Sequence, residues 1–370
     1  MQFNLNAVLV SERITATGGR ATGFDYLRFS LAVAVILFHT VVTGYGLEIQ
    51  ARVAKSNPGI LLDLILPMFF ALSGFLVAGS LERAKSILVF LGLRVLRIFP
   101  ALAVDTLFCA VILGPIFTSL ALSDYFSHAD FRSYFLNIIG NIHYYLPGVF
   151  ESNPMSRVNG QLWTIPVELE CYVVLTLLAL LGIHRYRWAM LAIFVLLLGA
   201  LETRVLMGMA EPWSGRVLLL CFLCGVIALQ FRDFIRLSLP VFAVAVVLSF
   251  VGLRYPALTY VGVIPITYIT VYLGLLNPRK SRLLQSGDYS YGLFLYGFPI
   301  QQALVALTPA ARLWYWNAAM AVPLALVFSI MSWHLVEKRV MARKHLLQTA
   351  HARCSAALGR ARLALFPSTR

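Results

Sequence analysis

Arg28 and His39 lie within one long apolar stretch near residues 26–46. They are eleven residues apart, which is about three helical turns, so a helix would place both on one face with a rise of about 16 Å between them. Charged or titratable groups are costly to bury in a membrane span and are therefore candidates for function. Because an imidazole titrates near neutral pH, His39 is the candidate general base.

A carboxylate at a matching depth is the expected partner of this histidine. Glu168 lies about seven residues, or roughly 10 Å, from the outer end of the apolar stretch near 161–182, and His39 lies about as far from the outer end of its own stretch. We therefore predict that Glu168 pairs with His39, provided that the two helices are neighbours, and that it holds the imidazole in one tautomer. A purely structural hydrogen bond between helices is the alternative.

Arg94 and Arg97 are two further basic residues, spaced i and i+3. This spacing presents both guanidinium groups on one face of a helix, and planar guanidinium forks suit phosphate oxygens. An ordinary interfacial pair that touches lipid phosphates is the alternative. Asp105 is expected to pair with one of these arginines, whereas Asp63 is expected near the outer surface, in contact with water.

The composition indicates which class of protein carries these groups. Of 370 residues, 60% are hydrophobic and only 12% are charged, and the mean hydropathy is +0.81, whereas soluble domains are roughly 45–50% apolar and about 25% charged. A water-soluble chain cannot cover so much apolar surface, so the sequence predicts an all-α, polytopic integral membrane protein. The five cysteines form no disulfide framework, and Cys221-x-x-Cys224 lacks a second Cys/His pair at zinc-like spacing, so no metal is expected.

The spans and their orientation follow from apolar length and from the basic residues. A spanning helix needs roughly 20 mostly apolar residues. Ten stretches approach this length, near residues 26–46, 58–81, 98–122, 161–182, 188–207, 214–231, 238–253, 257–276, 289–308 and 314–335. With both chain ends in the cytoplasm (N-in, C-in), twenty-one of the thirty basic residues fall on the inner side and eight on the outer side, as the positive-inside rule requires. The net charge of +14 then needs no nucleic-acid partner.

Three regions follow from this topology: a cytoplasmic N-terminal tail over 1–23, a transmembrane domain over 24–338 and a basic cytoplasmic tail over 339–370. The tail is expected to lie on anionic lipid, and no cleavable signal peptide is expected in the first 25 residues. Residues 82–97 interleave apolar and basic side chains and predict an amphipathic helix on the inner surface. The longest connection, 123–160, is predicted on the outer face, and such polar and aromatic loops often cover a site.

Five segments resemble, in this order, the motifs of the membrane acyltransferase 3 family, over about residues 24–338. They are Arg28-x10-His39 within FDYLRFSLAVAVILFHT, PMFFALSGFLVAGSL at 67–81, LRVLRIFPAL at 93–102, QLWTIPVELECYVVL at 161–175 and SYGLFLYGFPIQQAL at 290–304. Each motif alone is weak, but their order and topology are specific, and TIPVE and YGFPIQQ are similar to exopolysaccharide-modifying members. The resemblance places Glu168 and Tyr172 on the family's glutamate and tyrosine.

The chain departs from the family pattern at three points. Gly297 stands where many members have a histidine before Phe/Trp-Pro, so that histidine is not available here. Leu169 stands where many members have a second glutamate. No hydrolase-like domain follows the spans, so the chain is expected to act alone or with a separate partner.

The resemblance implies an O-acyltransferase of the bacterial inner membrane. It would move an acyl group, usually acetyl, from coenzyme A on the cytoplasmic side to a sugar hydroxyl of a surface or exported polysaccharide. On this view Arg94 and Arg97 hold the phosphates of acetyl-CoA, with Arg28 next along the path. His39 acts as general base, and Glu168 orients it or stabilises its protonated form. An acetyl-histidine intermediate is a second route.

Two aromatic residues, Trp163 and Tyr172, are expected to stack on the sugar, although aromatic residues at a membrane boundary also form an interfacial belt. A secondary transporter or glycan exporter with a His/Glu proton relay is the rival function, but the sequence contains no internal repeat of the kind common in transporters. Acylation of a lipid or small molecule is a third interpretation. The expected partners are membrane lipid, acyl-CoA and a glycan or lipid-linked glycan, and a homo-oligomer is left open.

Overall fold

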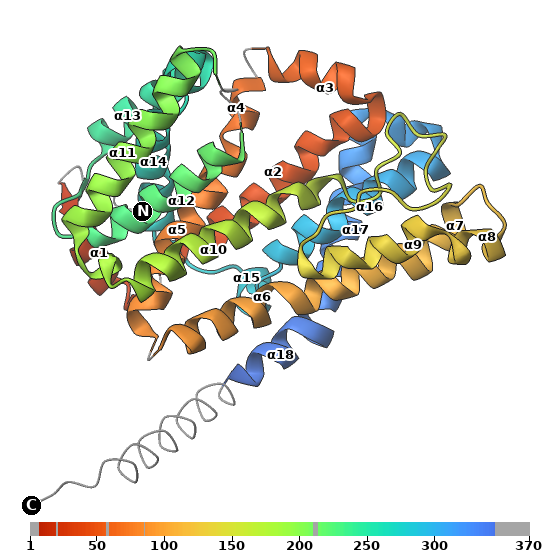
Figure 1. Cartoon of the computed structure of the whole chain (residues 1–370), viewed down its shortest axis with the longest axis horizontal. Coiled ribbons are helices and arrows are strands. Elements are labelled where there is room, and N and C mark those ends of the chain that lie inside the picture. The colour runs from red at the N-terminus through yellow and green to blue at the C-terminus, as the bar shows by residue number, and fades with distance from the viewer. Residues whose placement is uncertain (1–6, 20, 57–58, 85, 210–213, 345–370) are drawn as a thin grey trace, which may run out of the picture.

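The computed structural model describes residues 7–344 except 20, 57–58, 85 and 210–213, and it is almost entirely helical (Figure 1). The predicted C-terminal tail beyond residue 344 lies outside the described residues, as do residues 1–6. The helices and strands are β1 (Val8–Leu9), α1 (Val10–Ala16), α2 (Gly23–Tyr45), α3 (Leu47–Ala54), α4 (Gly59–Asp63), α5 (Ile65–Arg83), α6 (Ile87–Phe108), α7 (Gly114–Phe117), α8 (Leu122–Ser127), α9 (Ala129–Tyr134), α10 (Thr164–Leu180), α11 (Arg187–Leu206), α12 (Gly215–Gln230), β2 (Arg236–Leu237), α13 (Leu239–Arg254), α14 (Val263–Gly274), α15 (Arg282–Ser286), α16 (Ser290–Leu307), α17 (Trp314–Ser332) and α18 (Lys338–Ala342).

Among the residues that the structure describes, six helical runs are long and apolar enough to cross a membrane: Gly23–Tyr45, Gly59–Arg83, Ile87–Phe117, Gly160–Leu180, Arg187–Leu206 and Trp314–Ala342. Three shorter apolar helices, α12, α13 and α14, and the 18-residue helix α16 stand at the positions of the other four predicted spans. The structure thus agrees with an all-α membrane protein that has several spanning helices. The number of ten spans and the N-in, C-in orientation stay predictions.

Helix α12 forms the centre of the bundle, because every residue from Val217 to Leu229 is buried. A helix that is apolar on all sides is expected in such a position. Close contact with α5 depends on two glycines: a Cβ at Gly74 would overlap the backbone of Phe222, and a Cβ at Gly225 would overlap the backbone of Ala71. Small residues at a helix interface allow backbones to approach in this way.

The helices that carry the predicted site residues pack into two groups around this centre. Helix α2 packs against α5, α14, α16 and α17, whereas α10 packs against α6 and α12. Gln301 of α16 joins the first group, because its Nε2 donates to the carbonyl oxygen of Ile36 and to Oδ1 of Asn317, each at 2.9 Å. In Figure 1, α2, α10 and α6 run across the molecule in a similar direction, and α7–α9 lie at its right-hand end.

The predicted amphipathic surface helix over 82–97 is not a separate helix: most of it forms the first part of the continuous helical run Ile87–Phe117, which is long and apolar enough to cross a membrane. Helix α6 begins after Ser86, whose hydroxyl accepts a hydrogen bond from the backbone N–H of Val89 at 3.2 Å. It continues through Pro100 and a π-helical turn at Cys109–Leu113 to Phe117. The separate helix was predicted because basic residues were expected to face lipid head groups; in the structure Arg94 and Arg97 meet polar partners inside the protein.

A short pair of strands was not predicted. Strand β1 pairs with β2 in antiparallel register, Val8 opposite Leu237 and Leu9 opposite Arg236. The pairing ties the N-terminal segment to the connection between α12 and α13. Two-residue strands leave almost no alternating pattern in a sequence, so the prediction of helices alone missed them.

Candidate active site

A cavity of about 150 Å³ between α2, α5, α6, α10 and α16 collects the predicted basic residues; we call it the arginine cavity. Its polar lining residues are Arg28, Ser73, Arg94, Arg97, Thr164, Glu168, Tyr172, Ser290 and Tyr291. The three arginines come from two helices that are far apart in the sequence. Burying three positive charges in one cavity costs free energy unless the protein or a bound ligand supplies negative charge beside them.

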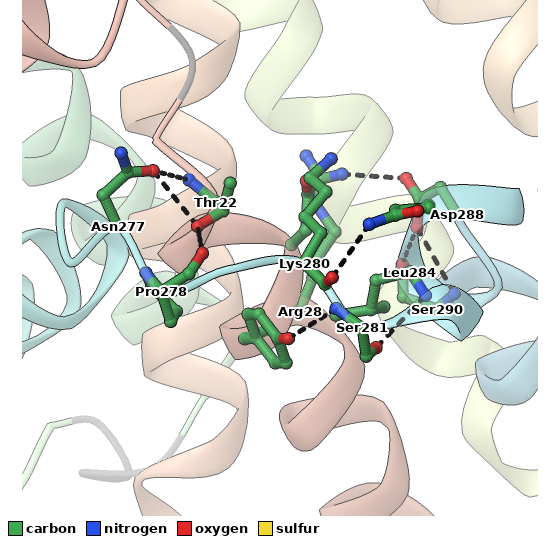
Figure 2. A network of polar contacts seen from close by, with 12 residues as sticks. Thr22, Arg28, Asn277, Pro278, Lys280, Ser281, Leu284, Asp288 and Ser290 are labelled. Carbon is green, nitrogen blue, oxygen red and sulfur yellow. Dashed lines mark hydrogen bonds and ion pairs between the residues drawn. The ribbon is translucent and has the colours of Figure 1, made fainter.

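Asp288 supplies one countercharge to two of the three arginines. Its Oδ2 lies 2.8 Å from Nη1 of Arg28 and 2.7 Å from Nη2 of Arg97, and Ser290 donates its hydroxyl to the other oxygen at 2.6 Å. Figure 2 shows Asp288 beside Arg28 and Ser290 in this network. Arg97 also lies 3.5 Å from Glu337. Arg28 and Arg97 are therefore held in place by the protein itself.

The charge state of Asp288 is set by these contacts. Burial opposes ionisation of its carboxyl group, but the guanidinium groups of Arg97 and Arg28 and the hydrogen bonds from Ser290 outweigh burial and hold the pKa of Asp288 well below its usual range. Asp288 is thus a carboxylate at any physiological pH. Sequence reasoning missed this residue, although it is the only acidic residue between 234 and 336, a signal that would have identified the countercharge.

Arg94 is held differently from the other two arginines. Its Nη2 donates a hydrogen bond of 3.4 Å to the hydroxyl of Ser80, and its Nε is buried without a hydrogen-bond partner among the described residues. Its guanidinium also lies 6.0 Å from the ring centre of Phe90. Arg94 forms no salt bridge within the described part of the chain, and Glu168 is the one carboxylate in the lining of the same cavity. The guanidinium of Arg94 therefore keeps hydrogen-bonding capacity for an anionic ligand.

Glu168 lines the arginine cavity and does not form the predicted pair with His39. The hydroxyl of Tyr172, one helical turn away, donates to Oε1 of Glu168. His39 lines a different cavity, and no hydrogen bond or ion pair joins the two side chains in the described structure. Tyr172 likewise lies in the arginine cavity and not beside Trp163, so the two aromatic residues predicted to stack on one sugar are separated.

The physical reason lies in which helices are neighbours and at what depth. Helix α2 packs against α5, α14, α16 and α17, so α10 is not among its main neighbours. Trp163, immediately before α10, lines the same cavity as His39. Glu168 follows Trp163 by five residues, which is about 7.5 Å deeper along a helix. The depth estimate counted from residue 161, but α10 begins only at Thr164, after the 3₁₀ turn Gly160–Trp163, and Gly160 and Trp163 themselves line the cavity of His39.

His39 faces a second cavity, of about 400 Å³, which we call the histidine cavity. The edge of its ring packs against Phe298 with the ring centres 5.1 Å apart and an interplanar angle of 78°. The ring nitrogens make no hydrogen bond to other residues in the described part of the chain. Besides His39, the charged or polar side chains that line this cavity are Gln50, Asp63, Arg157, Trp163 and Ser214.

Leu66 of α5 is the one residue that lines both cavities. It lies one residue before Pro67 and packs against both main hydrophobic clusters. The arginine cavity and the histidine cavity are therefore neighbours that meet at this side chain.

The 123–160 connection, which contributes residues to the wall of the histidine cavity, is anchored by Gln302 of α16. Its Nε2 donates to the carbonyl oxygens of Met155 and Arg157, each at 2.6 Å, and its own carbonyl groups accept from Nδ2 of Asn153 at 3.0 Å. The guanidinium of Arg157 stacks on Tyr144, 4.8 Å from the ring centre. The prediction that the 123–160 connection covers a site agrees with the presence of Met155, Arg157 and Gly160 in the cavity wall.

Asp105 does not pair with an arginine, contrary to expectation. It is completely buried, and its Oδ2 accepts a hydrogen bond of 3.0 Å from Nδ2 of Asn159, which also lies 2.9 Å from the hydroxyl of Tyr134. Gln161 continues this network, because its Nε2 donates to Oδ1 of Asn159 at 3.2 Å. Asp105 therefore anchors the end of the 123–160 connection next to the histidine cavity.

Gly297, the position that differs from the family pattern, lies against α2. A Cβ at this residue would come within 2.6 Å of Cγ1 of Ile36, one turn before His39. A histidine there would require the Ile36 side chain, or the helix that carries it, to shift. The structure thus explains in packing terms why this chain has glycine at that position.

Comparison with known proteins bears on the chemistry of these two cavities. The Acyl_transf_3 family model, described as an acyltransferase domain, matches residues 22–334. An O-acetyl transferase of Shigella phage Sf6 is 27% identical over 334 residues, which cover 86% of this chain and 96% of the relative. Nodulation protein 10 of Rhizobium leguminosarum bv. viciae is 25% identical over 360 residues, 88% of this chain and 94% of the relative. No solved structure matches the chain. The chain belongs to the acyltransferase 3 family.

Proposed function

We propose that this protein transfers an acetyl group from acetyl-CoA to a hydroxyl of a surface or exported polysaccharide, in the inner membrane of a bacterium. Membership of the family makes it a membrane-embedded enzyme that transfers an acyl group to a hydroxyl. The observation that carries the finer proposal is the meeting of two cavities at Leu66, one lined by three arginines and the other by His39.

The arginine cavity fits the anionic donor. The buried, unpartnered Nε of Arg94 fits an anionic oxygen, and guanidinium groups bind phosphate oxygens in a planar, two-pronged geometry. Arg28 and Arg97 are already oriented by Asp288 and add positive charge without having to be ordered on binding. By the positive-inside rule this cavity faces the cytoplasm, where acetyl-CoA is made available.

His39 acts on the acceptor in the histidine cavity. Its free ring nitrogen accepts the proton of the sugar hydroxyl as the hydroxyl oxygen attacks the thioester carbonyl carbon. The new C–O ester bond forms, the C–S bond breaks, and the thiolate of coenzyme A leaves toward the arginine cavity. An acetyl-histidine intermediate uses the same atoms in two steps. Glu168 accepts a hydrogen bond from Tyr172 and lines the arginine cavity, so it acts where the acyl donor binds and does not orient the imidazole of His39.

Arg94→Ala is expected to raise the KM for acetyl-CoA about tenfold or more, with a smaller change in kcat, because hydrogen bonds to charged groups contribute about 1.5–3 kcal/mol. Steady-state labelling with varied acetyl-CoA measures this. Arg185→Ala is the matched control, since Arg185 is exposed and lines neither cavity. An unchanged KM in Arg94→Ala removes the donor-binding role.

Leu66→Trp is expected to reduce acetyl transfer about 100-fold while acetyl-CoA still binds, because a misplacement of reacting groups by about 1 Å has an effect of that size. Binding of radiolabelled acetyl-CoA and transfer to glycan are measured on the same membranes. Leu62→Trp and Leu76→Trp are the controls, since each lines only one of the two cavities. Equal transfer in all three variants would contradict a passage at Leu66.

The proposed function itself is tested by incubating membranes that contain the protein with radiolabelled acetyl-CoA. Label is then measured in the glycan, lipid and protein fractions, with membranes that lack the protein as reference. We expect an alkali-labile label in the glycan fraction. Label only in the lipid fraction would make the acceptor a lipid, and no transfer of label at all would favour a transporter.

A further inference from the structure

The search for a carboxylate beside His39 leads to Asp63 rather than to Glu168. Asp63 is the last residue of α4, half-buried, and the only acidic residue among those that line the histidine cavity. Its carboxylate makes no hydrogen bond or ion pair with the other described residues. His39 and Asp63 thus come from different helices into one cavity, and neither titratable group is satisfied by a protein partner.

The rest of the cavity wall supplies the other groups that bind a sugar ring. Trp163 is 38% exposed, which leaves part of its indole free for an apolar ring face. The guanidinium of Arg157 is fixed on Tyr144 and its backbone is held by Gln302. Ligand sites commonly combine apolar and aromatic walls with a few polar groups in fixed positions.

We propose that Asp63 is the acceptor-binding carboxylate of this enzyme: it accepts hydrogen bonds from hydroxyl groups of a sugar ring that lies on Trp163, and so brings one hydroxyl to His39. A carboxylate offers two acceptor oxygens, which suits neighbouring hydroxyl groups of one ring. Arg157 on the same wall donates hydrogen bonds to other oxygens of the ring. The chemical class of ligand is a polyhydroxylated sugar unit of a glycan. This proposal rests on the proposed function.

The test measures acceptor and donor saturation separately. Membranes with wild-type protein or Asp63→Asn receive radiolabelled acetyl-CoA and increasing amounts of the glycan fraction extracted from the producing strain. We expect Asp63→Asn to raise the half-saturating amount of glycan about tenfold or more, with the half-saturating acetyl-CoA concentration unchanged. Asn keeps the size of the side chain but loses the charge and one acceptor.

Glu48→Gln is the matched control, because Glu48 is an outer-face acid that pairs with Arg52 at 2.6 Å and does not line the cavity. It should behave as wild type in both titrations. An unchanged half-saturating amount of glycan in Asp63→Asn overturns the proposal. If Asp63→Asn also loses acetyl-CoA binding, the variant is misfolded, and Asp63→Glu then decides: activity with weakened glycan saturation supports the role, and wild-type saturation overturns it.

Failure of the proposed function gives a different result. In that case the wild-type membranes themselves transfer no label to the glycan fraction, whatever the residue at position 63. If only the Asp63 proposal fails, wild-type membranes still label the glycan fraction. The half-saturating amount of glycan then stays the same in every Asp63 variant.

Discussion

His39→Ala is expected to lower acetyl transfer to glycan at least about 100-fold, because a positioned general base contributes roughly 10²–10⁴ in rate. The same loss is expected if the imidazole is itself acetylated. Binding of acetyl-CoA should be unchanged, since His39 lines the histidine cavity and not the arginine cavity. Transfer and binding are measured with radiolabelled acetyl-CoA on membranes that contain equal amounts of each variant.

The control for this prediction is Thr40→Ser, at the next position of the same helix. Thr40 is buried and donates its hydroxyl to the carbonyl oxygen of Leu37 at 2.7 Å, a bond that serine can also make. This variant should keep nearly full activity. Full activity in His39→Ala would contradict the chemistry proposed for the histidine cavity.

Asp288→Ala is expected to destabilise the protein by about 3–5 kcal/mol, because removing one partner of a buried ion pair leaves the other charges uncompensated. Two guanidinium groups, those of Arg28 and Arg97, lose their shared carboxylate, and these side chains are only 27% and 22% exposed. Thermal unfolding of purified protein in detergent measures the effect. Asp25→Ala is the control: Asp25 pairs with Lys280 where both side chains are about one-third exposed, so we expect a loss within about 1 kcal/mol. Equal losses of stability in the two variants would contradict the role of Asp288 as the shared countercharge of Arg28 and Arg97.

The pH dependence of stability follows from the lowered pKa of Asp288. A carboxyl group whose pKa is lower in the folded protein contributes stability above its usual pKa of 3.8, and this contribution is lost as the pH falls through the lowered value. Asp288 therefore adds no change in stability between about pH 5 and 8. The contribution of the Asp288 carboxylate itself should therefore be lost only in acid, which thermal unfolding of wild type and Asp288→Ala below about pH 5 measures.

Features that lie within a single helix could be predicted well from the sequence. The hydrophobic stretches identified most of the helices that reach across the bundle, and the spacing of Arg94 and Arg97 predicted two guanidinium groups that line one cavity. Arg28 also joined this group. The prediction for Arg94 and Arg97 depends on helix geometry alone, which is the same in every protein, whereas the position of Arg28 beside them depends on how two different helices are arranged.

Contacts between different helices could not be predicted well from the sequence. The pairing of His39 with Glu168 required two helices to be neighbours and their ends to be level, and neither condition can be read from one helix. The countercharge at Asp288 lies in the connection before α16, where no periodicity marks it. Asp63 was expected only to be hydrated. Its position next to the histidine cavity depends on how α4 packs against α3 and α5 and how α5 packs against α2, which the sequence of one helix does not show.

The central claim is that acetyl-CoA enters at the arginine cavity and the acyl group reaches an acceptor held beyond Leu66. Sealed membrane vesicles of both orientations test it most directly, with radiolabelled acetyl-CoA supplied only from outside and label measured in glycan. We predict labelling by inside-out vesicles, whose exposed face is the cytoplasmic one, and none by right-side-out vesicles. Labelling only by right-side-out vesicles, or equally by both, would contradict a donor site on the arginine side.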